Sequence, residues 1–277
     1  MRGLVERLLV RIPARHRGGA RLVLAYHNVV ADASRMGGDR SLHLPAATFE
    51  QQLDVVRAEA AIVPLMELLE GEGTSFPRVA ITFDDAYEGA LQHGLSACAV
   101  RGLPCTVFVS PALLGTIPEW DWRAAGGTWD ADARHRFLWD GRGFGHHQQR
   151  VAGDDALVAF SIATLDGVMH AARFPQVTFG NHTMHHANLG ALDTADVEAE
   201  IYACAEWLDS QSALSTVPVV AYPYGSAPRS QVPERFGLLV AGGWFRAPVP
   251  SHAIPRWNVP SGVSMNGFRA RLRGWLL

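Results

Sequence analysis

The sequence predicts an α/β protein in which the strands form a mainly parallel sheet or barrel. Short apolar runs alternate with segments of helical periodicity along the chain, as they do where helices connect parallel strands. With 277 residues, 48% of them hydrophobic, the chain is long enough for one α/β barrel, which commonly has about 250 residues. The two most polar motifs are an acidic doublet, Asp84-Asp85, and a histidine cluster at His182–His186. Each follows a predicted strand, and the loops after the strands carry the catalytic residues in such folds.

Eight apolar runs are predicted as strands, with helical patterns between them. In chain order these strands are Leu22–Tyr26, Ala61–Val63, Val79–Phe83, Cys105–Val109, Val177–Gly180, Val217–Tyr222, Leu238–Ala241 and Ile254–Val259. This alternation implies a mainly parallel sheet or barrel.

Three helices have recognisable boundaries. The first is expected to begin at an N-cap, Thr48, which a Gln follows three residues later. The second spans about residues 86–101 and stops at Gly102. The third begins near Asp193 or Thr194, and its apolar stripe consists of Val197, Ile201, Cys204 and Leu208.

Residues 115–175 break the alternation of strands and helices. This segment is rich in Gly and contains Trp120, Trp122, Trp129, Trp139, His135, His146 and His147. We interpret it as a long insertion over the face that carries the polar motifs, as a lid or a substrate wall. Padding of variable length is the alternative.

Residues 1–21 form a distinct basic segment, which leaves residues 22–277 as the main domain. The segment carries six Arg and one Glu, a net charge of +5, around an apolar stripe of Leu4, Val5, Leu8, Leu9 and Ile12. A basic amphipathic helix can lie on an anionic membrane. The alternative is a helix docked on the domain's own surface.

Composition excludes several functions and favours a compartment. All 24 basic residues are Arg, which excludes Schiff-base catalysis, pyridoxal phosphate attachment and a P-loop lysine. The net charge of −3 argues against a nucleic-acid partner. Cys98, Cys105 and Cys204 form an odd, scattered set, which favours reduced thiols. Without a signal peptide or a transmembrane stretch, we expect a cytoplasmic protein with peripheral membrane contact.

An acidic doublet and a histidine cluster supply the chemistry. Asp84 and Asp85 end an apolar run, and about a hundred residues later His182 and His186 follow another. Together these side chains can bind a divalent metal and leave one carboxylate as a base. Alone, the doublet would be interpreted as a solvated turn. His185 leaves the register open, because His182 and His185 could also meet on a helix.

The motif Thr82-Phe83-Asp84-Asp85, followed by His182-Thr183-x-x-His186, resembles the NodB-type polysaccharide deacetylases, carbohydrate esterase family 4. Further segments resemble that family in the same order: Leu24–Val29, Phe49 with Gln52 and Leu53, Glu119–Trp122, Ala221–Gly225 and Ile254–Arg256. The resemblance covers roughly residues 22–260. It implies a distorted (β/α) barrel of the NodB deacetylase type.

The resemblance also implies roles for the polar motifs. Asp85, His182 and His186 would bind the metal, and Asp84 would act as the catalytic base. His185 then becomes a rim residue or a substrate contact. Two imidazoles and one carboxylate suit zinc, with cobalt, nickel and iron as alternatives.

Three further roles follow from the resemblance and from departures from it. The backbone N–H of Tyr224 is expected to stabilise an oxyanion. Many family members have an Arg at the position of Ala221, and Arg256 is the candidate to replace it. The usual C-terminal His is missing from residues 262–277. The resemblance to one branch therefore assigns the general acid to His27.

These inferences predict a metal-dependent hydrolase that removes N-acetyl groups from a sugar or polysaccharide in surface-glycan metabolism. O-acetyl, formyl or other amide groups are alternative targets. A non-catalytic glycan-binding protein with a degraded site is a different class; the missing Arg and His favour it, and the intact Asp and His motifs oppose it. The other histidines are interpreted as structural or surface residues, and the pair His146-His147 is the best outside candidate for a second metal.

Overall fold

The computed structural model describes residues 2–15, 18–35, 37–72, 75–127, 130, 132–133, 135–136, 148–149, 160–230, 235–240 and 242–275. One parallel sheet dominates the fold, with strand order β11-β10-β9-β6-β5-β1-β12 and β4 beside the first half of β5. Its strands are β1 (Arg21–Tyr26), β4 (Ala61–Ile62), β5 (Arg78–Phe83), β6 (Cys105–Val109), β9 (Val177–Asn181), β10 (Thr216–Ala221), β11 (Phe236–Leu238) and β12 (Arg256–Asn258).

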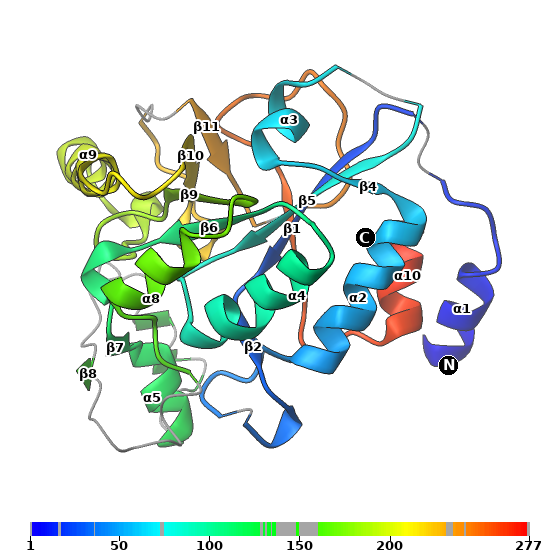
Figure 1. Cartoon of the computed structure of the whole chain (residues 1–277), viewed down its shortest axis with the longest axis horizontal. Coiled ribbons are helices and arrows are strands. Elements are labelled where there is room, and N and C mark those ends of the chain that lie inside the picture. The colour runs from blue at the N-terminus through cyan, green and yellow to red at the C-terminus, as the bar shows by residue number, and fades with distance from the viewer. Residues whose placement is uncertain are drawn as a thin grey trace.

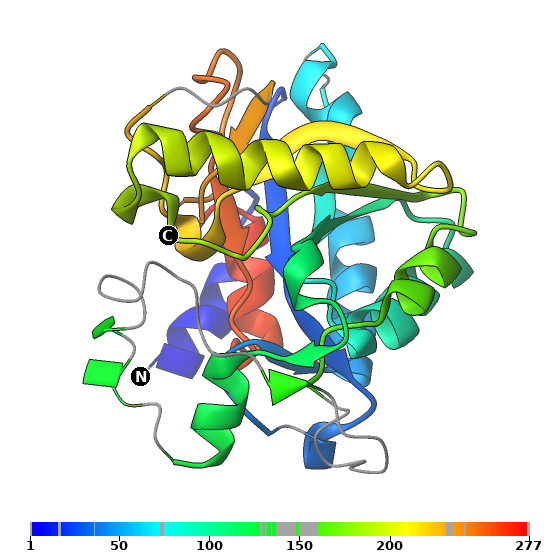
Figure 2. The same cartoon turned by 90° about the vertical axis from the view of Figure 1, so that its left-hand side faces the viewer.

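Helices surround the strands (Figures 1 and 2). The α-helices are α1 (Arg2–Leu9), α2 (Ala46–Glu59), α3 (Leu65–Glu70), α4 (Leu95–Val100), α5 (Glu119–Ala125), α8 (Leu165–Ala171), α9 (Thr194–Ser210) and α10 (Met265–Leu272). A π-helical turn, η2 (Ala90–Gly94), leads into α4, and 3₁₀ turns are η1 (Ala33–Arg35), η3 (Pro111–Leu113), η4 (Leu189–Ala191) and η5 (Pro223–Gly225). No described helix is long and apolar enough to cross a membrane.

The sheet closes into a distorted barrel. Its open edges approach each other where Leu238, at the end of β11, forms a parallel bridge with Ile254, just before β12. The amide of Ile254 donates to the carbonyl of Gly237, and the amide of Leu239 donates back to the carbonyl of Ile254. This closure confirms the predicted (β/α) barrel.

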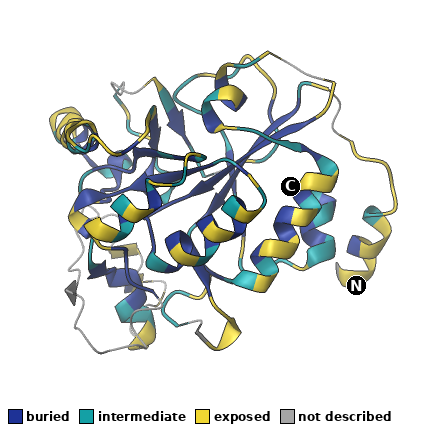
Figure 3. Ribbon diagram, in the orientation of Figure 1, coloured by how far each residue is buried: buried dark blue, intermediate teal, exposed yellow. Residues whose placement is uncertain are grey.

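The pleat of β1 and β5 separates two apolar clusters. Leu24 and Ile81 belong to the large cluster beneath the outer helices, whereas Val23 and Ala80 pack in a smaller cluster with Phe108. Successive side chains of a strand point to opposite faces, so Val23, Ala80 and Phe108 mark the barrel interior. Figure 3 shows that the strands are buried, whereas the helices expose their outer faces. Residues that continue the inward alternation past the strand ends therefore face the mouth of the barrel.

The structure corrects several predicted boundaries. β11 begins two residues before the expected start at Leu238. Helix α2 begins at Ala46, so Thr48 lies inside it rather than capping it. The second helix is irregular, because η2 interrupts it where Gly94 packs against the ring of Phe83. The third helix begins as expected, with the Asp193 side chain accepting from the amide of Asp196.

Two short strand pairs were not predicted from the sequence. β2 (Asn28–Val30) pairs with β3 (His43–Pro45), and β7 (Thr116–Ile117) pairs with β8 (Gln148–Gln149). Two or three residues are too few to show a period in the sequence. Much of the expected 115–175 insertion, including His146 and His147, lies outside the described residues.

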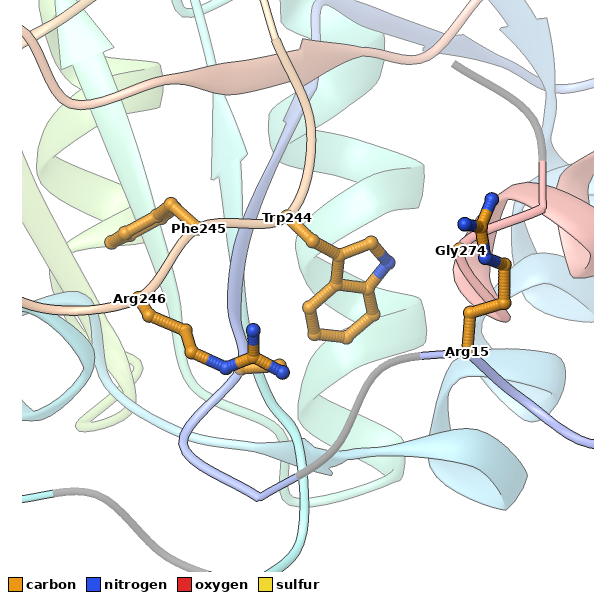
Figure 4. A pocket seen from close by; sticks show the side chains of 6 residues that line it. Arg15, Trp244, Phe245, Arg246 and Gly274 are labelled. Atoms are coloured by element: carbon orange, nitrogen blue, oxygen red, sulfur yellow. The ribbon is translucent and has the colours of Figure 1, made fainter.

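A cavity of about 300 Å³ lies at the amino-terminal end of the strands (Figure 4). Its lining includes Arg15, Trp244 and Arg246. The neighbouring Phe245 exchanges backbone hydrogen bonds with Arg21, the first residue of β1. The cavity is therefore at the opposite end of β1 from His27.

The aromatic cluster beneath the end of β5 gives a test of the core. Phe49 is fully buried, with its ring centroid 4.9 Å from that of Tyr26 and 5.6 Å from that of Phe83. We expect Phe49→Ala to lower the free energy of unfolding by about 3–5 kcal/mol, because it leaves a cavity. Urea denaturation measures this. Val100→Ala, at a side chain 86% exposed, should change stability by less than about 0.5 kcal/mol, and equal effects would contradict this account of the core.

Candidate active site

The acidic doublet directly follows β5 at the mouth of the barrel. Both carboxylates are buried. The amide of Asp84 donates a 2.9 Å hydrogen bond to the carbonyl of Tyr26, which extends the pairing of β1 and β5 by one step. Asp84 also continues the inward alternation of Ala80 and Thr82. Asp85 then adopts a φ of 68°, so the chain turns and the two carboxylates have different partners.

The histidine motif lies in a tight loop after β9, not on a helix. The Asn181 side chain accepts a 2.8 Å hydrogen bond from the amide of Thr183, and the Thr183 hydroxyl accepts one of 3.0 Å from the amide of Ala187. Thr183 and His186 both have positive φ angles. This loop brings His182 and His186 together and excludes the helical pairing of His182 with His185.

Asp85, His182 and His186 converge on one point. Asp85 Oδ1 lies 3.3 Å from His182 Nε2 and 3.0 Å from His186 Nε2. One ligand atom from each of these three buried side chains lies within 4.8 Å of the others. Among the described residues they form the group able to hold a metal ion.

The hydrogen bonds around this group fit a cation. The carbonyl of Ala221 can only accept, so His182 Nδ1, 2.7 Å away, donates its hydrogen. In the neutral ring, Nε2 then presents a lone pair to Asp85 Oδ1, which is buried and has no hydrogen-bond donor. A metal ion or an added proton removes the repulsion between these atoms. The backbone contact at Nδ1 also orients the ring, as the partners of metal-binding histidines do.

His186 and His185 have different surroundings. The Nδ1 atom of His186 lies 3.0 Å from the Tyr224 hydroxyl, and its ring packs 4.8 Å from that of Trp120. His185 instead contacts Glu200 on α9, with 2.7 Å between Nδ1 and Oε1. The structure thus places His186 in the group and His185 outside it.

Arg256 forms a two-point ion pair with Asp84. Its Nη1 and Nη2 atoms lie 2.7 and 2.8 Å from the two carboxylate oxygens. The pair is buried, and the guanidinium also lies over the ring of Phe108. Sequence reasoning proposed this Arg as the substitute for the one missing at Ala221, and the structure brings it to the doublet. Its function there remains a prediction.

Charge and burial act in opposite directions on these groups. Burial alone would raise the pKa of Asp84, but the Arg256 guanidinium and His182 outweigh it, and the pKa is lowered. Burial likewise opposes ionisation of Asp85, yet His186 and His182 bring its pKa well below the ordinary value. Burial dominates at His186 and lowers its pKa. Both carboxylates are therefore ionised near neutral pH.

His27 and Tyr224 border the same site. His27 follows β1 and continues the inward alternation of Val23 and Ala25. It is partly buried, and it is among the groups that contribute to the lowered pKa of Asp84, so the two side chains lie within electrostatic reach of each other. Tyr224 follows β10 within η5 and has a φ of 58°. The structure thus brings all the predicted site residues to one end of the barrel.

A buried polar network beside the site was not predicted. Asn28 Nδ2 donates to His43 Nδ1 over 3.0 Å, and His43 Nε2 donates to Asp121 Oδ1 over 2.9 Å. The Tyr87 hydroxyl donates to Asp121 Oδ2 over 2.6 Å and accepts from Trp120 Nε1 over 2.7 Å.

The network ties together three segments of the site. Asn28 follows His27, Tyr87 follows the acidic doublet, and Trp120 packs on His186. Asp121 lies within the aromatic motif Glu119–Trp122 that the sequence analysis identified. His43 was interpreted as structural or surface, and no sequence signal linked it to Asp121, 78 residues away.

Comparisons with known proteins agree with this architecture. A sequence profile of the family described as polysaccharide deacetylase matches residues 71–235. Among curated proteins there is no match. Several solved structures share the fold, and three of them are described next.

The deacetylase PplD of Streptococcus pyogenes, in complex with acetate, gives a TM-score of 0.64 at 15% identity, over 94% of this chain and 99% of that chain. IcaB from Ammonifex degensii gives 0.59 at 17% identity, over 94% and 97%. The BpsB deacetylase domain from Bordetella bronchiseptica gives 0.58 at 14% identity, over 87% and 96%.

The barrel and these comparisons define a hydrolase of the deacetylase class. The profile covers more than half of the residues, and the chain belongs to the NodB-type polysaccharide deacetylases, carbohydrate esterase family 4. The resemblance seen in the sequence is thereby confirmed. His27 and Arg256 lie outside the matched segment, so their assignments depend on the geometry described above.

The convergent group predicts metal binding that depends on His186. We expect protein purified without chelator to carry about one divalent ion per chain, and His186→Ala to lose at least about 10-fold in affinity for it. Elemental analysis and titration of the metal-free protein measure this. His185→Ala is the matched control, because His185 binds Glu200 instead. Stoichiometric metal in His186→Ala, or its loss only in His185→Ala, would contradict the assignment.

Proposed function

We propose that this deacetylase uses a divalent metal to hydrolyse N-acetyl groups of a sugar or polysaccharide in surface-glycan metabolism. The observation that carries the proposal is the pairing of Asp84 with Arg256 beside the convergent Asp85, His182 and His186. Hydrolysis of an amide needs a base for water, charge stabilisation at the carbonyl oxygen and a proton for the leaving amine. The site supplies a candidate for each.

A metal fits the residues that are present. A divalent ion held by Asp85, His182 and His186 would act as a Lewis acid that polarises the amide carbonyl and makes water more acidic. Two imidazoles and one carboxylate suit zinc. Three protein ligands leave room for water and substrate.

Asp84 is proposed as the base. Its two-point contact with Arg256 fixes the plane of the carboxylate and keeps it ionised, so that it can accept a proton from the attacking water. The lowered pKa makes Asp84 a weaker base, but it also prevents a proton from occupying the carboxylate before the substrate arrives.

The other roles follow from position. The backbone N–H of Tyr224 is proposed to donate to the carbonyl oxygen as the carbon becomes tetrahedral and negative charge develops there. His27 is proposed to protonate the nitrogen as the carbon–nitrogen bond breaks. Water and the acetylated amine then yield acetate and the free amine, and no covalent acyl-enzyme is required.

The neighbouring structures support the substrate class. PplD is a deacetylase whose structure contains acetate, the small product that N-acetyl hydrolysis would release. A non-catalytic glycan-binding function is the alternative, supported by Ala221 in place of a family Arg and by the missing C-terminal His. Arg256 now provides a guanidinium at the doublet from another strand, which favours catalysis. Measuring acetate release from N-acetylated glycans, with metal content measured in parallel, separates these functions; metal-loaded protein that releases no acetate would contradict the proposal.

The catalytic unit is proposed to be residues 22–277, acting in the cytoplasm. The first strand, β1, begins one residue before this boundary, at Arg21; the strands from there to Asn258 build one barrel, and α10 packs on α2. No disulfide joins the three buried cysteines, which is compatible with a reducing compartment.

Removing the proposed base should separate catalysis from metal binding. We expect Asp84→Asn to retain the metal but to lower kcat about 100- to 10,000-fold, because a nearly isosteric amide cannot accept the proton. Steady-state kinetics and metal analysis of the same preparation measure this. Asp54→Asn is the control, since that exposed carboxylate on α2 pairs with Arg101 and belongs to no part of the site. Near-normal turnover of Asp84→Asn would mean that another base operates.

The proposed acid should matter only when the leaving group needs a proton. We expect His27→Ala to slow hydrolysis of an N-acetyl amide at least about 100-fold while changing that of an activated acetate ester only a few-fold. The ratio of kcat/KM values for the two substrates measures this. His170→Ala, at an exposed ring on α8, should leave both unchanged. Equal losses on amide and ester would exclude His27 as the acid.

A further inference from the structure

The amino-terminal helix is docked on the barrel through its polar side. Helix α1 packs against α10. Glu6 is its buried residue, only 5% exposed, and its carboxylate accepts a 2.6 Å hydrogen bond from the Ser264 hydroxyl at the N-cap of α10. An amphipathic helix that docks on its own domain normally buries its apolar stripe. Here the sequence-based alternative of a docked helix is correct, but every member of the apolar stripe except the half-buried Leu9 is turned outward.

Polar contacts fix this orientation beyond the helix. Arg273 donates from Nη1 to the carbonyls of Val10 and Ile12. The amide of Arg15 donates back to the carbonyl of Arg273 over 2.8 Å, and Trp275 Nε1 donates to the carbonyl of Pro13 over 3.1 Å. Residues 6–15 are therefore attached along their length to the carboxyl-terminal segment.

The outward side forms an apolar ridge, consisting of Leu4, Val5, Leu8 and Ile12. Their exposed fractions are 66, 49, 54 and 40%. The other large apolar side chains that are exposed in the described residues are separated in sequence: Phe76, Val100, Leu165 and Tyr202. Scattered exposed apolar residues need no explanation, whereas a contiguous group marks a contact surface.

Charge identifies the partner of the ridge. Arg7, Arg11 and Arg15 are exposed within the same segment, and Arg15 also lines the cavity that contains Arg246 (Figure 4). Residues 1–21 carry +5 while the whole chain carries −3, so residues 22–277 carry −8. A symmetric dimer through the ridge would bring two such cationic segments together, which is unfavourable. The partner must therefore be both apolar and anionic.

We propose that the ridge inserts into the headgroup region of an anionic lipid bilayer. Exposed Leu and Ile side chains would enter the acyl boundary, and the Arg side chains would contact lipid phosphates and carboxylates. In Figure 1, α1 lies at the opposite end of the long axis of the molecule from α5. Docking through α1 therefore leaves the active site uncovered, and the inference does not depend on the proposed reaction.

Co-sedimentation of the full chain with lipid vesicles tests the proposal. Vesicles of phosphatidylcholine alone are compared with vesicles containing phosphatidylglycerol, at low and high salt. We expect binding to the anionic vesicles that weakens with salt, and a loss of about 10-fold or more in partitioning for Leu4→Ser combined with Leu8→Ser. Val100→Ser combined with Leu165→Ser is the matched control, because it removes two exposed apolar side chains elsewhere.

A second pair of substitutions tests the role of the Arg side chains, and three results would overturn the proposal. Arg7→Gln combined with Arg11→Gln should remove the preference for anionic vesicles, and circular dichroism should show that all variants are folded. Absence of vesicle binding, or equal binding by the ridge variant and the control variant, would overturn the proposal. Sedimentation equilibrium without lipid tests the alternative occupant, a second copy of this chain. A dimer that the ridge variant abolishes would show that a second copy covers the ridge, and would also overturn the proposal.

Discussion

The buried ion pair between Arg256 and Asp84 is the contact on which the rest of the site depends. Removing one member of such a pair leaves an uncompensated charge and typically costs about 3–5 kcal/mol. Two parallel hydrogen bonds make the pair tolerable inside the barrel and fix the plane of the carboxylate. The same geometry leaves Asp85, the next residue, to turn away toward the two imidazoles.

This pair requires the barrel to close as it does. Arg256 and Ala80 both align with Val23, on either side of β1. The guanidinium must therefore extend along the barrel interior, from the level of Ala80 toward the strand end where Asp84 lies. A lysine could not form the planar two-point contact after spanning that length. The position of β12 beside β1 is thus as important to the site as the acidic doublet itself.

The sequence predicted the barrel strands well, because buried strands depend on local patterns, and it placed the proposed site residues at strand ends that the structure brings together. Apolar runs identify buried strands, and the chain order places their polar ends together. The interruption at η2 was not predictable, since it reflects the packing of Gly94 against Phe83. The pairing of His43 with Asp121 was also hidden, because it joins an unpredicted short strand to α5. The direction in which α1 faces depends on the hydrogen bond between Glu6 and Ser264, far apart in the chain.

Five non-glycine residues have positive φ angles in the described part of the chain: Asp85, Ala86, Thr183, His186 and Tyr224. All lie in the three loops that form the site. Each such conformation is destabilising by about 1–3 kcal/mol. This lowers the free energy of unfolding of the protein whether or not a ligand is bound. Binding then needs little backbone reorganisation, so affinity is gained at the expense of thermal stability. Substitutions that relax these loops should therefore produce a more heat-resistant protein that is a poorer catalyst.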